Sequence, residues 1–220
     1  MSGLLSVAGL GIFSGNWFDD YHDNSLYYAA FVSIEKEVFH QRALESQILN
    51  NLHRDDVEAK ILRVISRYRT GLDKKRQQQI PHWIIQESKK YGYDPLFVTA
   101  IIITESSFNN WARSNRGAFG LMQILPTTGI VLAVETQLEW KGEPTLFDPG
   151  TNIALGTYYF HKLVRRFGDL RLALEAYNHG PSRLRSYLNK GKIPRFYSKK
   201  VFRNYEKIRS LQSGQRQQGI

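Results

Sequence analysis

The sequence contains no cysteine in 220 residues, and its six histidines lie far apart along the chain. The absence of cysteine excludes disulfides, cysteine-bound metals and a thiol nucleophile. The histidines lack the short spacings of a metal site, so we expect no metal and no cofactor. We interpret all six as structural or surface residues: His22, His40, His53, His82, His161 and His179.

The N-terminal segment has no basic residue before Lys36, and its apolar run, LLSVAGLGIF, is short. Spanning a bilayer takes about 20 apolar residues, and a standard export signal begins with positive charge. The segment therefore predicts an export signal that is weak or absent. Three interpretations stay open: a poor export signal, an interfacial segment, or the start of a truncated gene product.

The net charge of +10 is unevenly distributed. Residues 1–60 hold nine acidic and four basic side chains, whereas the segment from Arg183 to the end holds eleven basic side chains and one acid, Glu206. Such a basic segment favours an anionic partner: a cell-wall polymer, a membrane surface or nucleic acid. A solvated segment that only aids solubility is an equal alternative.

Long stretches of alternating polar and apolar residues are lacking, and helical periodicity dominates. The pattern predicts a mainly α fold with little or no β, apart from a short hairpin near residues 115–125. We interpret Asp94 and Asp148, each followed by proline, as helix caps, and Asp55 and Asp56 as caps of an earlier helix. The expected helices cover residues 27–53, 57–68, 83–91, 95–105, 149–167 and 170–178.

The stretch GLDKKRQQQIP, residues 71–81, predicts a domain boundary because it is polar and basic and ends in proline. We expect an N-terminal helical extension of unknown role over residues 1–75 and the main helical domain over residues 76–210. Residues 211–220 are expected to form a flexible basic and polar tail.

An acidic residue ends an apolar helix in ITESSFNN, residues 103–110. On a helix that starts at Pro95, Glu105 shares a face with Ile101 and Ile102, at spacings of four and three. It also lies in the last turn, where the helix dipole is negative. Burial and the dipole both disfavour the carboxylate and raise its pKa toward that of a general acid. The alternative is a partly exposed glutamate at a helix end.

Three stretches extend this observation: ESSFNNWARSNRGAFGLMQILP, FDPGTNIALGTYYFHKLVRRFG and ALEAYNHGP. In this order and at these separations they closely resemble the catalytic domain of the soluble lytic transglycosylases. These are bacterial enzymes with a goose-type-lysozyme-like fold that cleave peptidoglycan. The resemblance starts near KKYGYDPLFVTAIIITESSF and ends near Arg185, about half of the chain.

The resemblance implies that Glu105 is the catalytic acid and base. Amide side chains in the matching motifs both donate and accept hydrogen bonds, which suits the acetamido groups and hydroxyls of a glycan. Departures from the family pattern at Asn110, Trp111 and His179 bear on loop conformation and subsite preference and remove no catalytic group. The implied substrate-binding residues are Ser114, Gly120, Met122, Gln123, Tyr177 and Asn178.

The implied reaction cleaves the β-1,4 bond between N-acetylmuramic acid (MurNAc) and N-acetylglucosamine (GlcNAc) and forms 1,6-anhydroMurNAc. Most glycosidases need two carboxylates, unless the substrate supplies the second group. The motif region has one clear candidate, because we interpret Asp148 as a helix cap and place Glu135, Glu139 and Glu175 in polar loops or on a helix face. A single glutamate with assistance from the N-acetyl group is therefore expected.

Three alternatives stay open. A hydrolytic muramidase (lysozyme) on the same scaffold would need a second acid near Glu105. A non-catalytic glycan-binding module would be expected to have lost that acid. Binding to nucleic acid would use the aromatic side chains of the basic segment, but no binding motif accompanies them, so no nucleic-acid partner is expected. These side chains are Phe196, Tyr197, Phe202 and Tyr205.

The expected partner is the glycan strand of peptidoglycan. The basic C-terminal segment is expected to pack as a helix on the domain or to contact an anionic cell-wall or membrane surface. Because peptidoglycan lies outside the cytoplasm, we expect the protein in the periplasm or cell envelope.

Overall fold

The computed structural model describes residues 24–211, and for residues 24–31 the backbone alone. The N-terminal apolar run and residues 212–220 of the expected tail lie outside this range. The described residues fall into two units, which part between Asn51 and Leu52. The elements are α1 (Asn24–Ile65), α2 (Lys74–Tyr91), α3 (Pro95–Ser106), α4 (Pro126–Thr136), the 3-10 helix η1 (Glu143–Phe147), α5 (Pro149–Phe167), α6 (Leu170–His179), α7 (Pro181–Asn189) and α8 (Phe196–Arg209).

The described part of the first unit is the N-terminal portion of α1, and its side chains over residues 33–51 are exposed to solvent. The predicted break between two helices at Asp55 and Asp56 is wrong, because α1 is continuous through both residues. An ion pair between Lys60 and Asp56, at 3.0 Å and four residues apart, supports the helix there. Among the described helices, none has the length and apolar character needed to cross a membrane.

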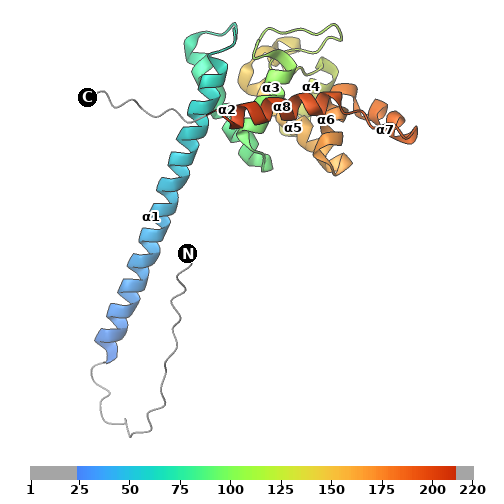
Figure 1. Cartoon of the computed structure of the whole chain (residues 1–220). Coiled ribbons are helices and arrows are strands. Elements are labelled where there is room, and N and C mark those ends of the chain that lie inside the picture. The colour runs from blue at the N-terminus through green and yellow to red at the C-terminus, as the bar shows by residue number, and fades with distance from the viewer. Residues whose placement is uncertain (1–23, 212–220) are drawn as a thin grey trace. The chain divides into compact units, whose positions relative to one another are not determined.

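The centre of the second unit is α3, where residues 96–102 are all buried. A helix that is apolar on every side needs neighbours on every side. It packs against α2 and α8, while α5 packs against α2, α4 and α6. Figure 1 shows α8, in red, lying across this group of helices, and α8 also contacts α6. The basic C-terminal segment thus packs as a helix on the domain, as predicted.

Helix starts and stops follow the predicted local signals. Asp94 accepts a hydrogen bond from the Leu96 N–H (2.8 Å) at the start of α3, and Asp148 accepts one from the Thr151 N–H (2.9 Å) at the start of α5. Gly168 ends α5 with φ +67°, a conformation that glycine adopts without strain. The mainly α fold is therefore confirmed.

Two local predictions differ from the structure. Helix α2 begins at Lys74, inside the stretch predicted as a boundary, because Asp73 caps it and accepts a hydrogen bond from the Arg76 N–H at 2.8 Å. Lysine, arginine and glutamine are good helix formers, so the polar composition favours a helix rather than a linker. The expected hairpin is reduced to isolated bridges of Phe119 with Arg113 and Ile124, with no strand among the described residues. The domain limits at residues 75 and 210 remain predictions.

Candidate active site

A cleft of about 740 Å³ opens in the second unit and collects five of the seven predicted site residues. The two others, Gly120 and Met122, are not part of its lining. The five come from the end of α3, the loop that follows it and the end of α6. They are Glu105, Ser114, Gln123, Tyr177 and Asn178.

Glu105 lies in the last turn of α3, which ends at Ser107 in the left-handed conformation (φ 50°). The helix is buried up to Ile102, whereas Glu105 is partly exposed. The carboxyl group therefore emerges from the apolar core at the wall of the cleft. No other acidic side chain lines this cleft among the described residues.

Burial raises the pKa of Glu105 from 4.5 to about 7. Two neighbours act in the opposite direction: a hydrogen bond from Tyr197 and the positive charge of Lys200. The Tyr197 hydroxyl donates to Glu105 Oε1, and the Lys200 ammonium donates to the carbonyl oxygen of Thr104 at 3.3 Å. Glu105 thus gives up or takes a proton near neutral pH, as a general acid and base must.

Tyr197 belongs to the first turn of α8, and its side chain is 6% exposed. Burial, and then the nearby Glu105, hold its pKa well above the ordinary value, so its hydroxyl stays a donor. We did not predict this contact from the sequence. The available signal was the apolar face that Tyr197, Val201 and Ile208 form on α8 at helical spacing, which indicates burial but not a partner.

Two serines fix the loop that follows α3. The Ser106 hydroxyl donates to the carbonyl oxygen of Leu121 at 2.8 Å and joins the helix end to the loop. The Ser114 hydroxyl oxygen accepts from the backbone N–H groups of Arg116 (3.2 Å) and Ala118 (3.0 Å). The Ser114 hydroxyl can therefore still donate its own proton to another group.

Gly120 and Met122 do not line the cleft, and they pack against η1 and α5 instead. Gly120 has φ +81°, and a Cβ there would meet the Leu146 carbonyl oxygen at 2.3 Å and the Asn152 amide nitrogen at 2.4 Å. Met122 is fully buried, and its N–H donates to Asn152 Oδ1 at 2.7 Å. Its sulfur packs closely over Gly156 of α5, so both residues anchor the loop to helices.

The remaining predicted residues surround Glu105. The Gln123 amide donates to the carbonyl oxygen of Gly120 at 2.9 Å, which leaves its own oxygen able to accept from a ligand. The Tyr177 hydroxyl donates to the carbonyl oxygen of Met122 at 2.8 Å rather than to Glu105. Asn178 is exposed at the end of α6 and offers its whole amide to the cleft.

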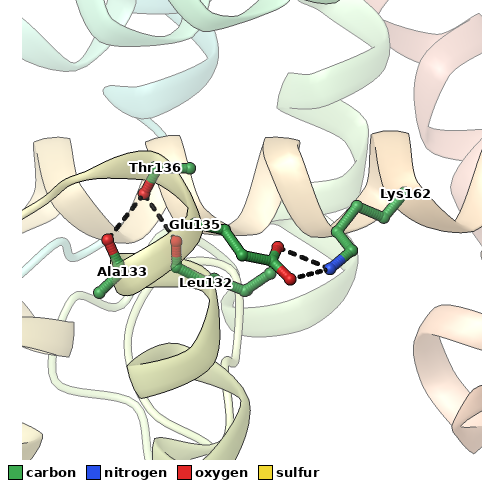
Figure 2. A network of polar contacts seen from close by, with 5 residues as sticks. All are labelled: Leu132, Ala133, Glu135, Thr136 and Lys162. Atoms are coloured by element: carbon green, nitrogen blue, oxygen red, sulfur yellow. Dashed lines mark hydrogen bonds and ion pairs between the residues drawn. The ribbon is translucent and has the colours of Figure 1, made fainter.

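Other acids near the motif region have structural partners outside the cleft. Figure 2 shows both carboxylate oxygens of Glu135 accepting from the Lys162 ammonium, each at 2.6 Å, and this bond lowers the pKa of Glu135. Glu139 pairs with Lys141 at 3.0 Å, and Asp148 caps α5, as predicted. None of these three carboxylates lines the cleft.

Glu175 lies on a face of α6, within the predicted choice of a polar loop or a helix face. It is fully buried, and α8 packs against α6 and donates the Ser198 N–H to it. It does not line the cleft. Among residues 24–211 we find no cluster of histidine, aspartate and glutamate that would hold a metal ion.

Two arginines extend the site. Arg116, in the loop after α3, and Arg183, in α7, both line the cleft and are exposed. Because Glu105 is the one acidic residue of the lining, the cleft is positive when Glu105 is protonated. Such a cleft attracts an anionic ligand.

The model of the transglycosylase SLT domain family matches residues 82–198, more than half of the chain, so the chain belongs to this family. The fold agrees with this assignment. The chain is similar to the 70 kDa soluble lytic transglycosylase of Escherichia coli, with TM-score 0.53 and 28% identity, over 61% of this chain and 25% of that one. The lytic transglycosylase Slt of Pseudomonas aeruginosa, in an inactive variant, matches with TM-score 0.53 and 27% identity, over 60% and 25% of the two chains.

Curated relatives match the same region. The soluble lytic murein transglycosylase of Escherichia coli K12 is 38% identical over 94 residues, which are 42% of this chain and 15% of the relative. The transglycosylase of Enterobacteria phage PRD1 is 34% identical over 117 residues, 53% of this chain and 39% of the relative. The membrane-bound lytic murein transglycosylase C of Cronobacter sakazakii is 41% identical over 95 residues, 42% and 26% of the two chains. The chain therefore spans well under half the length of these relatives.

Proposed function

We propose that the protein is a peptidoglycan lytic transglycosylase that cleaves the MurNAc–GlcNAc β-1,4 bond with formation of 1,6-anhydroMurNAc. The observation that carries this proposal is a single carboxyl group, Glu105, with a pKa of about 7 and no second acid in the cleft. Membership of the SLT family supports peptidoglycan as the substrate.

In the first step Glu105 gives its proton to the glycosidic oxygen, and the bond from MurNAc C1 to that oxygen breaks. The carbonyl oxygen of the MurNAc N-acetyl group bonds to C1, and the positive charge spreads over the resulting oxazolinium ring, as in other substrate-assisted glycosidases. The GlcNAc side leaves with a free 4-hydroxyl, and Glu105 becomes a carboxylate.

In the second step the 6-hydroxyl of the same MurNAc attacks C1 and displaces the N-acetyl oxygen. Its proton passes to the Glu105 carboxylate, which restores the starting enzyme. The product carries a 1,6-anhydro ring, and no water is consumed. Tyr197 and Lys200 stabilise the carboxylate between the two steps, since both favour the charged form of Glu105.

The rest of the cleft suits this substrate. Gln123 and Asn178 offer amide groups for acetamido and hydroxyl groups of the glycan. Arg116 and Arg183 offer positive charge for the carboxylates of the peptide that MurNAc carries on its lactyl group. The site of action is then the cell envelope, where peptidoglycan lies.

The test is digestion of purified peptidoglycan, with products analysed by mass spectrometry. We expect muropeptides with anhydro ends, each one water molecule lighter than the hydrolysis product. Glu105→Gln should lower the rate by about 10²–10⁴-fold, the range for loss of general acid–base catalysis. Glu135→Gln removes an exposed carboxylate outside the cleft and should leave the rate unchanged. Anhydro products at the native rate from Glu105→Gln would refute the proposal.

A hydrolytic muramidase is the second candidate, and reducing ends in the same digest would establish it. It needs a carboxylate to activate water, and the cleft offers none besides Glu105. Nucleic-acid binding through aromatic stacking is disfavoured, because Tyr197 is buried and Phe202 and Tyr205 pack against Phe97. Of that set only Phe196 is fully exposed.

A further inference from the structure

A buried carboxylate that the proposed reaction does not use lies behind the cleft. Glu175 Oε1 accepts a hydrogen bond from the Ser198 N–H at 2.8 Å. The other oxygen, Oε2, has no hydrogen-bond partner among the described residues and lies 3.6 Å from His179 Nε2. A buried polar side chain with an oxygen that lacks a hydrogen-bond partner is costly and calls for an explanation.

The first oxygen of Glu175 caps α8. The residue in the N-cap position, Arg195, supplies no side-chain hydrogen bond to the helix. The N–H of Ser198 is one of the first N–H groups of a helix, which have no partner within the helix itself. A carboxylate at this end also interacts favourably with the helix dipole. The start of α8 is thus fixed by a residue of α6.

The first turn of α8 carries the donor to Glu105. Tyr197 directly precedes Ser198, and its hydroxyl donates to Glu105. Farther along α8 the helix contacts the end of α3 through polar bonds to Thr104, from Lys200 Nζ at 3.3 Å and from Asn204 Nδ2 at 2.9 Å. A shift of this turn would withdraw Tyr197 from the carboxyl group.

The second oxygen of Glu175 faces the edge of the cleft. His179 lines the cleft, and its ring packs edge-on against Tyr187, with centroids 5.4 Å apart. A protonated imidazole would form an ion pair with Glu175 at the observed distance. The same buried side chain therefore joins the first turn of α8 to His179, which lines the cleft at the end of α6.

We propose that Glu175 is a positioning residue, which anchors the first turn of α8 so that Tyr197 stays hydrogen-bonded to Glu105 and which fixes His179 at the edge of the cleft. The inference rests on the proposed function, because its effect is measured through the chemistry of Glu105. It assigns to Glu175 a part in catalysis without contact with the substrate.

The experiment is a double-mutant cycle on kcat for release of anhydro muropeptides by the full chain. Glu175→Ala and Tyr197→Phe should each lower kcat about tenfold, with KM changed by less than about twofold. If Glu175 acts through Tyr197, the double variant should be no slower than the slower single variant, because coupled residues are not additive. Glu175→Gln keeps an oxygen that accepts from Ser198 and should retain most of the rate.

A matched control is Glu87→Gln in α2, because Glu87 is also buried but lies outside the cleft. Its kcat should equal that of the native chain. Losses that multiply in the double variant, or a loss of equal size in Glu87→Gln, would overturn the inference. If circular dichroism shows that Glu175→Ala does not fold, Glu175→Asp replaces it in the cycle. The aspartate side chain is too short to accept the hydrogen bond from the Ser198 N–H.

The pH profile of kcat separates this role from a loss of stability. The groups that face Glu105 are Tyr177, Tyr197 and Lys200, and Glu175 itself faces His179 and Tyr197. Detachment of Tyr197 removes an interaction that favours the charged form of Glu105, so the alkaline limb should move to higher pH in Glu175→Ala and in Tyr197→Phe alike. An unmoved limb in Glu175→Ala would refute the inference. A native chain that yields no anhydro product would refute the proposed function instead.

Discussion

The two helices that meet at Glu105 have opposite characters. α3 contains no basic residue, and all of residues 96–102 are buried. α8 is basic and amphipathic, and only four of its residues are buried, all on one face. The first helix supplies the acid, and the second supplies the hydroxyl and the ammonium group that act on it.

This difference explains how the pKa of Glu105 reaches about 7. The apolar helix places the carboxyl group where burial disfavours its charge. The amphipathic helix then lowers the pKa of Glu105 in part, because its buried face carries Tyr197 and its polar face carries Lys200. A helix apolar on all sides could not supply both effects, since it would have no charged side to place near Glu105.

The largest effect that we expect concerns burial. Ile101→Ala in α3 should lower the free energy of unfolding by about 2–5 kcal/mol, because the side chain is almost fully buried and its removal leaves a cavity. Arg203→Ala on the exposed face of α8 should change it by no more than about 0.5 kcal/mol. Urea denaturation measures both. Similar losses for the two variants would contradict the contrast between the helices.

The next effect is the dependence of stability on pH. Folding raises the pKa of Glu105 from 4.5 to about 7, so the folded state holds the proton more tightly. The contribution of this proton to the free energy of unfolding is fully present below pH 4.5 and is lost as the pH rises to about 7. Glu105→Gln cannot ionise and should lack this loss. The difference between the two chains is at most about 3 kcal/mol, and less because Glu105 is partly exposed.

Thermal unfolding of both chains between pH 4 and pH 8 provides the measurement. Because the two chains differ by one ionisable group, the difference between their unfolding temperatures should change with pH only in this window. Parallel curves across the window would mean that the pKa of Glu105 is not raised by folding.

The smallest effect that we expect concerns Tyr197 of α8. The native rate should fall as the pH rises above about 7, because Glu105 then lacks the proton that it must donate. Tyr197→Phe should lower kcat about tenfold and move this alkaline limb to higher pH. Tyr205→Phe, on the same helix, removes a hydroxyl that donates to Asp94 outside the cleft and should leave the limb in place. An identical shift in both variants would point to a general change in α8.

Local patterns in the sequence predicted much of the fold. Asp94 and Asp148 cap the predicted helices, and Gly168 ends one of them, because capping depends on residues a few positions apart. The same kind of reasoning failed at Asp55 and Asp56, which are inside α1. A residue that caps a helix in one place is tolerated within a helix in another, and the choice depends on neighbours that the local pattern does not contain.

The candidate site residues were implied by the resemblance to the lytic transglycosylase family, with helix position as separate support for Glu105. Five of the seven residues line one cleft. The contacts of Tyr197 with Glu105 and of Glu175 with Ser198 were not predicted. They join residues 92 and 23 positions apart, and hydrophobic periodicity gives the face of a helix but not its partner.

The sequence by itself determined that one acid ends an apolar helix and that no thiol is available for catalysis. It also determined where that helix begins and ends, because caps and apolar spacing are local properties. Only the tertiary structure decided which groups surround the acid and how far its pKa rises. The physical reason is that desolvation and hydrogen bonding depend on which helices pack together, and here α8 comes to α3 from a distant part of the chain, with α6 packed against α8.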